Sequence, residues 1–501
     1  MKAFILILYY YALFSVTQGD FTGSSEDILK DVEKFRFETL YKNAASRSLN
    51  NYVDLDVDPC DNFYKFSCGN WIKAMEKERG DSELFHYDSR TTNFNNFIIG
   101  NIFFAITYLL SDSLTGKYNN ESNAIKNIYN LKMKCIQLPR EEMRKCVAEI
   151  GAFGAYAYSS LFVKKNRIDI NKHGEYAILE DMIKRIKEEF RLLIDEKTNI
   201  FDKESRDNLV QKLNEMEFVR DFFEHGLSSV LLMENCYKNI GISENDNIED
   251  VLKNIEHYKK LSEINGKMNL CALNIFKYNK YMTLFVYTNA MYYSMYNKFT
   301  ISSDAFNEPS FSRYFPNSLN YGYIGYTVAH EILHGFDSDG YKYIFGEDQE
   351  KYLIVSSESM KNFEMKSDCL VQQYSDQIES ITGLNVNGKS TLDENIADNG
   401  GLKIAHRAYM KYLQSIGGEE PKIPGFEKFN SEQLFFMSFG RSYCEHRNKD
   451  SLKKMIEKET HAPAEIRTIV TLSNYKPFSD AFNCPVNSKM NPVHKCELWK
   501  N

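Results

Sequence analysis

Two stretches in the first half of the chain carry apolar residues at the three- and four-residue spacing of an amphipathic helix. In the first stretch, residues 171–197, the stripe consists of Leu179, Met182, Ile183, Ile186, Phe190, Leu193 and Ile194. In the second, roughly residues 204–223, it consists of Leu209, Leu213, Met216 and Val219. Stripes with this period are typical of helices that bury one face. We predict two core helices here and assign no chemistry to them.

The pattern changes in the second half of the chain. Residues 281–303, YMTLFVYTNAMYYSMYNKFTISS, are rich in Tyr, Thr, Val and Phe, which favours one or two strands over a helix. Glycine and proline are sparse, at 25 and 10 of 501 residues, and no internal repeat is visible. A helical first half followed by helices mixed with a few strands predicts a predominantly α-helical α+β fold.

The N-terminus has the pattern of a secretion signal. Lys2 precedes an apolar run over residues 3–16, and small residues stand at −3 and −1 of a cut after Gly19. The run is shorter than the roughly 20 residues that span a bilayer, so we predict cleavage, with a type II signal anchor as the alternative. No later segment is predicted to span a membrane, and the mature protein is expected to be extracellular.

Charge and cysteine content narrow the function classes. A net charge of −8, with no run of basic residues, gives no reason to expect nucleic-acid binding. Ten cysteines behind a secretion signal predict disulfides, and because none forms a CxxC pair, a cysteine-ligated zinc site is not expected. The sequon at Asn120 is a candidate N-glycosylation site.

The stretch YTVAHEILHGFDSDG, residues 326–340, carries the candidate chemistry. His330 and His334 stand four residues apart, which brings both to one face of a helix, where two neutral imidazoles can bind one Zn²⁺. Glu331 follows the first histidine and can act as general base on a water at the metal. A five-residue pattern also recurs by chance, so a third ligand has to be found.

The third ligand is sought downstream. Position 340 is glycine, which excludes a third histidine six residues after His334. The segment TLDENIADNGG, residues 391–401, has Glu394 and Asp398 at helical spacing. Glu394 would complete a His₂Glu set with the fourth position open for water.

The remaining carboxylates suit supporting roles. Asp398 and Asp337 could each accept a hydrogen bond from the second N–H of a ligand imidazole. Composition alone, however, favours a simpler interpretation of Glu394 and Asp398, namely an acidic, solvated first turn stabilised by the helix dipole.

Several separate motifs resemble the neprilysin and endothelin-converting-enzyme family of zinc metallopeptidases. They are, in chain order, DPCDNFYKFSCGNW (58–71), TNAMYY (288–293), NSLNYGYIGYTVAHEILHGFDSDG (317–340), ENIADNGG (394–401), ETHAPAEIR (459–467), AFNC (481–484) and CELW (496–499). The resemblance covers nearly all of the chain after residue 55. It implies a thermolysin-like zinc peptidase catalytic domain with a second, reduced helical lobe.

On this basis we divide the chain into four parts. They are a signal peptide at 1–19, a linker or N-terminal extension at 20–54, a reduced helical lobe at 55–225 and the catalytic domain at 226–501. The resemblance implies one Zn²⁺ per chain and assigns its binding to His330, His334 and Glu394. It also implies that Glu331 is the base that activates water for attack on a peptide bond.

The resemblance also assigns substrate contacts. Asn289 and Ala290 would hold the backbone of a peptide substrate at a strand edge. His461 would donate to the oxyanion of the tetrahedral intermediate, and Arg467 would donate to the carbonyl just beyond the cut. Without the family, His461 and Arg467 would be interpreted as surface polar residues.

The primary substrate pocket departs from the family pattern. Tyr326 and Thr327 stand where relatives have apolar residues, and Ser442 and Tyr443 replace another apolar–aromatic pair. The substitutions predict a more polar and shallower pocket, which puts the family's preference for large hydrophobic residues after the cut in doubt.

By matched position the family pattern implies four disulfides, Cys60–Cys484, Cys68–Cys444, Cys369–Cys496 and Cys135–Cys146. Cys236 and Cys271 are left over, and either pair or stay free. Longer family members carry a large helical insert between the counterparts of Cys135 and Cys146, where this chain has only residues 136–145. The lid over the site is therefore expected to be mostly missing, with weaker size exclusion of substrates.

The sequence thus predicts a secreted zinc metalloendopeptidase acting on peptides. The alternative is a catalytically weak or inactive peptide-binding protein that keeps the site and has lost its enclosure. Retention of Glu331, Asp398, His461 and Arg467 beside the ligands favours the enzyme. The oligomeric state is not predicted.

Overall fold

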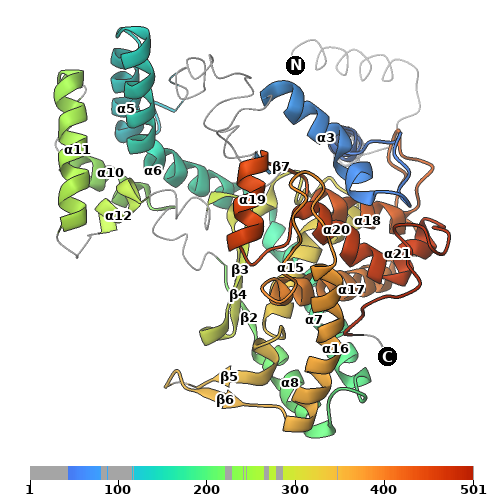
Figure 1. Cartoon of the computed structure of the whole chain (residues 1–501). Coiled ribbons are helices and arrows are strands. Elements are labelled where there is room, and N and C mark those ends of the chain that lie inside the picture. Colours follow the sequence, from blue (N-terminus) through green and yellow to red (C-terminus); the bar gives the residue numbers. More distant parts are fainter. Residues whose placement is uncertain are drawn as a thin grey trace, which may run out of the picture.

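The structure is a computed structural model that describes residues 43–79, 87–88, 116, 118–220, 228–240, 242–243, 245–264, 270–277, 286–346 and 348–499. This part is mostly helical with a few short strands, which confirms the predominantly helical α+β prediction (Figure 1). The predicted signal peptide lies outside the described residues.

The helices are distributed along the whole described chain. In the N-terminal half they are α3 (Phe63–Arg79), α5 (Asn123–Cys135), α6 (Arg140–His173), α7 (Glu175–Glu196), α8 (Lys203–Glu215), α10 (Val230–Asn239), α11 (Ile248–Ile264) and α12 (Leu270–Phe276). In the C-terminal half they are α14 (Asn317–Asn320), α15 (Tyr326–His334), α16 (Ser357–Ser375), α17 (Leu392–Ser415), α18 (Ser431–Arg441), α19 (Lys449–Lys458), α20 (Ala464–Asn474) and α21 (Lys476–Ala481).

Within the described residues, the strands form three small sheets. The largest has the order β2–β4–β3, in which β2 (Glu217–Phe218) is parallel to β4 (Lys298–Ile301) and β3 (Ala290–Tyr293) is antiparallel to it. The others are the antiparallel pairs β5 (Tyr343–Phe345) with β6 (Lys351–Leu353), and β1 (Tyr87–Asp88) with β7 (Glu445–His446). β3 and β4 confirm the strands predicted within residues 281–303.

The two predicted core helices correspond to α7 and α8. All seven apolar residues of the first predicted stripe are buried on α7, as its period requires. The second helix is shorter than predicted, because α8 ends at Glu215 and residues 217–218 form β2. The amide of Val219 continues this pairing by donating to the carbonyl oxygen of Phe299 on β4 at 2.9 Å. Strand pairing therefore replaces the predicted helix over residues 217–219, and its last predicted residues, 221–223, lie outside the described residues.

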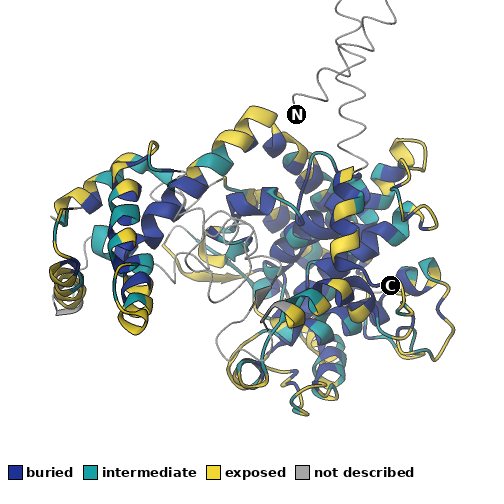
Figure 2. Cartoon of the chain, turned by 90° about the horizontal axis from the view of Figure 1, so that it is seen from above, coloured by how far each residue is buried: buried dark blue, intermediate teal, exposed yellow. Residues whose placement is uncertain are grey.

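Two hydrophobic cores divide the described chain, and they do not follow the predicted boundary at residue 225. The smaller core draws only on residues 118–163 and 230–287, and forms the lobe of α5, α10, α11 and α12 at one end of the molecule (Figure 1). The larger core takes α3, α7 and α8 together with residues 299–499. α6 contributes Val163 to the smaller core and Ile170 to the larger. Packing thus places α7 and α8 with the C-terminal helices in the larger core. Figure 2 shows buried segments gathered inside this larger part of the molecule, with exposed segments around them.

The predicted linker over residues 20–54 also differs in its last part. Residues 43–52 are helical, and Ala45 and Leu49 within them are fully buried in the larger core. The described end of this segment is therefore part of the larger core, because its apolar residues pack there.

One helix within the described ranges, α6, is long and apolar enough to cross a membrane by length and composition. This corrects the expectation that no later segment has that composition. Of its most apolar stretch, 78% is buried inside the protein, as in a core helix of a soluble domain.

All ten cysteines are paired in disulfides. The four pairings that the resemblance implies are present, and Cys236 pairs with Cys271 as a fifth. The Cys135–Cys146 bridge closes the short connection between α5 and α6, and the Cys236–Cys271 bridge joins α10 to α12 within the same lobe. Five disulfides fit an oxidising, extracellular compartment.

Candidate metal site

The site is built on α15, which runs through the larger core. Val328, Ala329, Ile332 and Leu333 are all fully buried, so the apolar positions that surround the two histidines anchor the helix. α17 packs directly against α15, and its glycine pair permits the approach. A Cβ on Gly401 would lie only 3.0 Å from the backbone nitrogen of His330. The close packing brings Glu394 and Asp398, from the first turns of α17, to the histidines.

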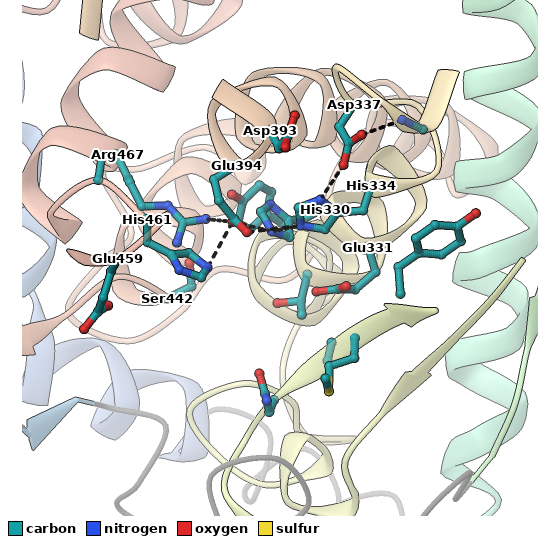
Figure 3. A pocket seen from close by; sticks show the side chains of 18 of the residues that line it. His330, Glu331, His334, Asp337, Asp393, Glu394, Ser442, Glu459, His461 and Arg467 are labelled. Atoms are coloured by element: carbon teal, nitrogen blue, oxygen red, sulfur yellow. Dashed lines mark hydrogen bonds and ion pairs between the residues drawn. The ribbon is translucent and has the colours of Figure 1, made fainter. Parts of the chain in front are cut away.

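Three side chains predicted as metal ligands converge on one point (Figure 3). Nε2 of His330 lies 3.1 Å from Nε2 of His334 and 3.3 Å from Oε2 of Glu394, and Nε2 of His334 lies 3.5 Å from Oε1 of Glu394. Bond lengths of 2.0–2.1 Å in a tetrahedral zinc site separate neighbouring ligand atoms by about 3.3 Å. The spacing of the three ligand atoms therefore matches Zn²⁺.

The outer nitrogens of both histidines face carboxylates. Nδ1 of His330 lies 3.0 Å from Oδ1 of Asp398, and Nδ1 of His334 lies 3.2 Å from Oδ2 of Asp337. A proton held on each Nδ1 leaves the Nε2 lone pairs directed at each other and at Glu394. Three lone-pair donors facing one point, two nitrogens and an oxygen, fit a divalent cation with mixed imidazole and carboxylate ligands.

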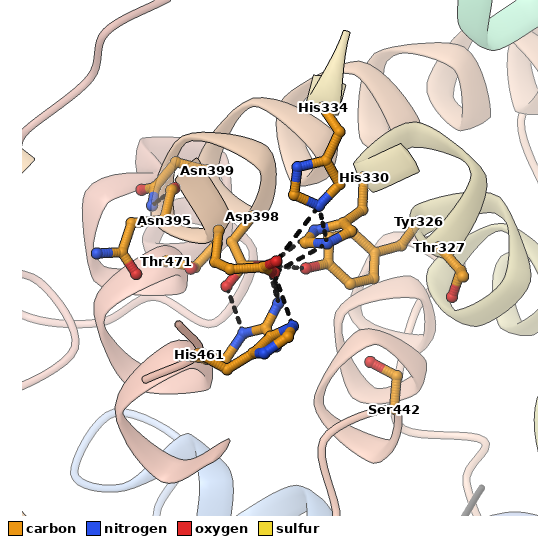
Figure 4. A network of polar contacts seen from close by, with 12 residues as sticks. Tyr326, Thr327, His330, His334, Asn395, Asp398, Asn399, Ser442, His461 and Thr471 are labelled. Atoms are coloured by element: carbon orange, nitrogen blue, oxygen red, sulfur yellow. Dashed lines mark hydrogen bonds and ion pairs between the residues drawn. The ribbon is translucent and has the colours of Figure 1, made fainter. Parts of the chain in front are cut away.

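Arg467 from α20 keeps Asp398 charged. Its Nε donates to Oδ2 and one terminal nitrogen donates to Oδ1, both at 2.7 Å. Figure 4 shows Asp398 close to His330 and Tyr326 within this polar network. Burial raises the pKa of Asp398, and the Arg467 guanidinium outweighs this effect, so the pKa is held well below its usual range. The carboxylate that faces His330 therefore remains an anion.

Arg467 and His461 both reach Glu394. The same terminal nitrogen of Arg467 lies 3.2 Å from Oε2 of Glu394, and Nε2 of His461 lies 3.1 Å from that oxygen. The His461 side chain is 43% exposed and lines the cavity over the metal site. These two residues, which sequence alone would place on the surface, are brought to the site by the structure.

Glu331 extends from α15 into the same cavity (Figure 3). The residue is only 7% exposed, and within the described ranges its carboxylate makes no hydrogen bond to the protein. Burial raises the pKa of Glu331, although the neighbouring His334 and His330 oppose this. A buried, unengaged carboxylate with a raised pKa is suited to accept a proton.

The cavity has a volume of about 840 Å³ and is bounded on one side by the start of β3. Asn289 and Ala290 line it, and Asn289 is held by the Ser302 hydroxyl, which accepts from its backbone N–H at 3.0 Å. In the described sheet β3 pairs only with β4, so its other edge offers backbone groups to a ligand.

The pocket residues Tyr326, Thr327, Ser442 and Tyr443 line the cavity, but their hydroxyls turn away from it. The hydroxyls of Tyr326 and Tyr443 donate to Oδ1 of Asp398 at 2.7 and 2.9 Å. The Thr327 hydroxyl donates to the carbonyl oxygen of Tyr323 at 3.1 Å, and the Ser442 hydroxyl to that of Phe439 at 2.7 Å. The wall is therefore less polar than its residue types suggest, because each hydroxyl binds an internal acceptor.

Lys212 on α8 is a site-supporting residue that the sequence pattern did not single out. It is 4% exposed, and its ammonium donates to the carbonyl oxygens of Gly340 and Tyr343 at 2.6 and 2.7 Å. Burial lowers the pKa of Lys212 to about 8. These bonds fix the loop that carries Asp337. The sequence feature that could have identified Lys212 is its position as a lysine next to the apolar stripe of α8.

Comparison with known proteins extends these observations. Residues 289–498 match Peptidase family M13. The chain is 31% identical over 394 residues to neprilysin from Oryctolagus cuniculus, an alignment covering 78% of this chain and 50% of that protein. It is 34% identical over 363 residues to neprilysin-3 from Drosophila melanogaster, covering 72% and 44%. The chain thus spans about half the length of the curated relatives it matches.

Solved structures share the fold. A chain of the Haemonchus galactose containing glycoprotein complex aligns with a TM-score of 0.57 at 19% identity, covering 92% of this chain and 99% of that one. The Mycobacterium tuberculosis zinc metalloprotease in complex with inhibitor aligns with a TM-score of 0.50 at 18% identity, covering 73% and 52%.

Proposed function

This chain belongs to peptidase family M13, and on that premise we propose that it is a secreted zinc metalloendopeptidase that hydrolyses peptide bonds. The convergence of His330, His334 and Glu394 next to the buried Glu331 carries the proposal. Purified protein incubated with short unstructured peptides should cleave internal bonds, as followed by mass spectrometry. Peptides that stay intact at every zinc concentration would favour the binding-protein alternative.

The side chains around the ligands have distinct roles in the proposed reaction. Zn²⁺ bound there supplies a Lewis acid and lowers the pKa of water. Glu331 takes the proton of the attacking water and passes it to the leaving amine. His461, which reaches the cavity from the far side of Glu394, donates to the oxyanion that develops on the scissile carbonyl.

The substrate backbone is proposed to add to β3 along the edge that faces away from β4 in the described sheet. Asn289 and Ala290 at the start of that strand support the proposal, because they line the cavity beside the metal site. Two nitrogens of Arg467 are engaged with Asp398, so donation from Arg467 to the carbonyl beyond the cut falls to its second terminal nitrogen.

A short connection between α5 and α6 predicts that large substrates enter the site. Cys135 and Cys146 are only 11 residues apart, and they close the lobe where relatives of the family carry their insert. We expect the ratio of kcat/KM for a long unfolded chain to that for a ten-residue peptide to be about ten times higher than for a full-length relative. Fluorescent casein and a quenched peptide measure both values. An equal or lower ratio would contradict the prediction.

Secretion is proposed from the N-terminal pattern together with the five disulfides. The Asn120 sequon also supports secretion. Asn120 is exposed in a turn just before α5, where the glycosylation machinery of the secretory pathway can reach it. N-terminal sequencing of the protein recovered from culture medium should begin near Asp20. A membrane-retained protein that still carries residues 1–19 would favour the type II anchor.

A further inference from the structure

Two tyrosine hydroxyls meet at the aspartate behind the metal site. Tyr326 and Tyr443 both donate to Oδ1 of Asp398, at 2.7 and 2.9 Å, and the two hydroxyls also contact each other. Oδ1 is the oxygen that lies 3.0 Å from Nδ1 of His330. The tyrosines are 4% and 9% exposed and Asp398 is fully buried, so water does not substitute for these hydroxyls.

The two hydroxyls are not needed to neutralise the negative charge of Asp398. Arg467 already holds both oxygens of Asp398, and its guanidinium also lies over the Tyr443 ring at 5.0 Å. An ion pair with two hydrogen bonds satisfies the charge of a buried carboxylate. The hydroxyls instead add two hydrogen bonds to Oδ1 of Asp398, the oxygen that faces His330.

The placement of Tyr326 couples the cavity wall to the ligand. Tyr326 stands four residues before His330 on α15, so the two rings share one face of the helix, with centroids 6.1 Å apart. Tyr443 reaches the same oxygen from the segment after α18, and both rings line the cavity. Tyr326 and Tyr443, which line the cavity, thus contact Asp398. Asp398 in turn contacts the predicted metal ligand His330.

We propose that the hydroxyls of Tyr326 and Tyr443 are positioning groups for the metal site, fixing Oδ1 of Asp398 where it orients the His330 imidazole. The inference rests on the proposed function, because that function requires Zn²⁺ at this site. The two hydroxyls add hydrogen bonds to Oδ1 beyond the ion pair that Arg467 makes with both oxygens of Asp398. Outer partners of ligand histidines typically contribute 10- to 100-fold to metal affinity.

The test measures Zn²⁺ affinity of the whole chain by competition with a chelator of known affinity. Tyr326→Phe and Tyr443→Phe each keep the ring, and each is expected to weaken Zn²⁺ binding about 10-fold. The double variant should lose less than the product of the two single losses, because both hydroxyls act on one oxygen. The visible spectrum of the Co²⁺-loaded variants should shift as the histidine ligand reorients.

Tyr409→Phe is the matched control. Tyr409 is a fully buried tyrosine on α17 that donates to Oε2 of Glu420 at 2.9 Å, away from the cavity. Its loss should lower the thermal midpoint about as much as the other substitutions while leaving the Zn²⁺ affinity unchanged.

Three results separate the possibilities. Unchanged Zn²⁺ affinity and Co²⁺ spectrum in both site variants, with a lower thermal midpoint alone, would overturn the inference by assigning the hydroxyls a structural role. Tighter binding would also overturn it, because the hydroxyls would then compete with His330 for Oδ1. A wild-type chain that binds no Zn²⁺ would overturn the proposed function itself, and this inference with it.

Discussion

Glu331→Gln is expected to lower kcat for peptide cleavage by about 10²- to 10⁴-fold, the contribution of a positioned general base. Glutamine has nearly the same shape but cannot take a proton at neutral pH. Glu331 contributes no atom to the group formed by His330, His334 and Glu394. One zinc per chain should therefore remain bound to the variant.

The measurement pairs steady-state kinetics with zinc content of the same samples. Glu459→Gln is a suitable control, because its carboxylate also borders the cavity but is 46% exposed and lies 3.8 Å from Arg447 rather than at the metal site. It should change kcat by less than about threefold, since an exposed pair contributes little. Full activity in Glu331→Gln would rule out Glu331 as the base.

Glu394→Gln should weaken Zn²⁺ binding by more than about 100-fold, beyond the range reported for outer partners of the ligands. Burial raises the pKa of Glu394, but His330 and His461 outweigh this effect, so the pKa lies well below its usual value and the carboxylate is an anion. A neutral amide removes that charge and leaves Arg467 with one acidic partner fewer.

Asp393→Asn is the control for this variant, one residue away on the same helix. Asp393 accepts from the Ser338 backbone at 3.2 Å and does not belong to the converging ligand group. Equilibrium dialysis against buffered Zn²⁺ should give Asp393→Asn an affinity within about threefold of wild type. If the two variants bound zinc equally well, Glu394 would not be the third ligand.

The sequence could predict the group of His330, His334 and Glu394, which the structure brings together, because metal binding depends on residue type and helical spacing. His330 and His334 share a face at four residues apart, and so do Glu394 and Asp398. Their mutual approach could not be read from spacing, since it depends on Gly401 letting two helices pack closely. The family resemblance, rather than the spacing, predicted that these two pairs of residues lie together.

Features set by tertiary packing were harder to predict. The direction of the Tyr326 hydroxyl follows from the position of Asp398, which is 72 residues away in the chain. The assignment of α7 and α8 to the larger core likewise depends on faces that pack against C-terminal helices. Local patterns specify which face is apolar, but they do not specify its partner.

Titration of Zn²⁺ into the metal-free chain, with peptide hydrolysis as the readout, tests the proposed function most directly. Hydrolysis should be absent at the start and rise linearly, reaching its plateau at one Zn²⁺ per chain, since the described residues that match a peptidase zinc site converge on the single point between His330, His334 and Glu394. Hydrolysis that is independent of added Zn²⁺, or that stays absent when one Zn²⁺ is bound, would contradict the assignment of this chain as a zinc metalloendopeptidase.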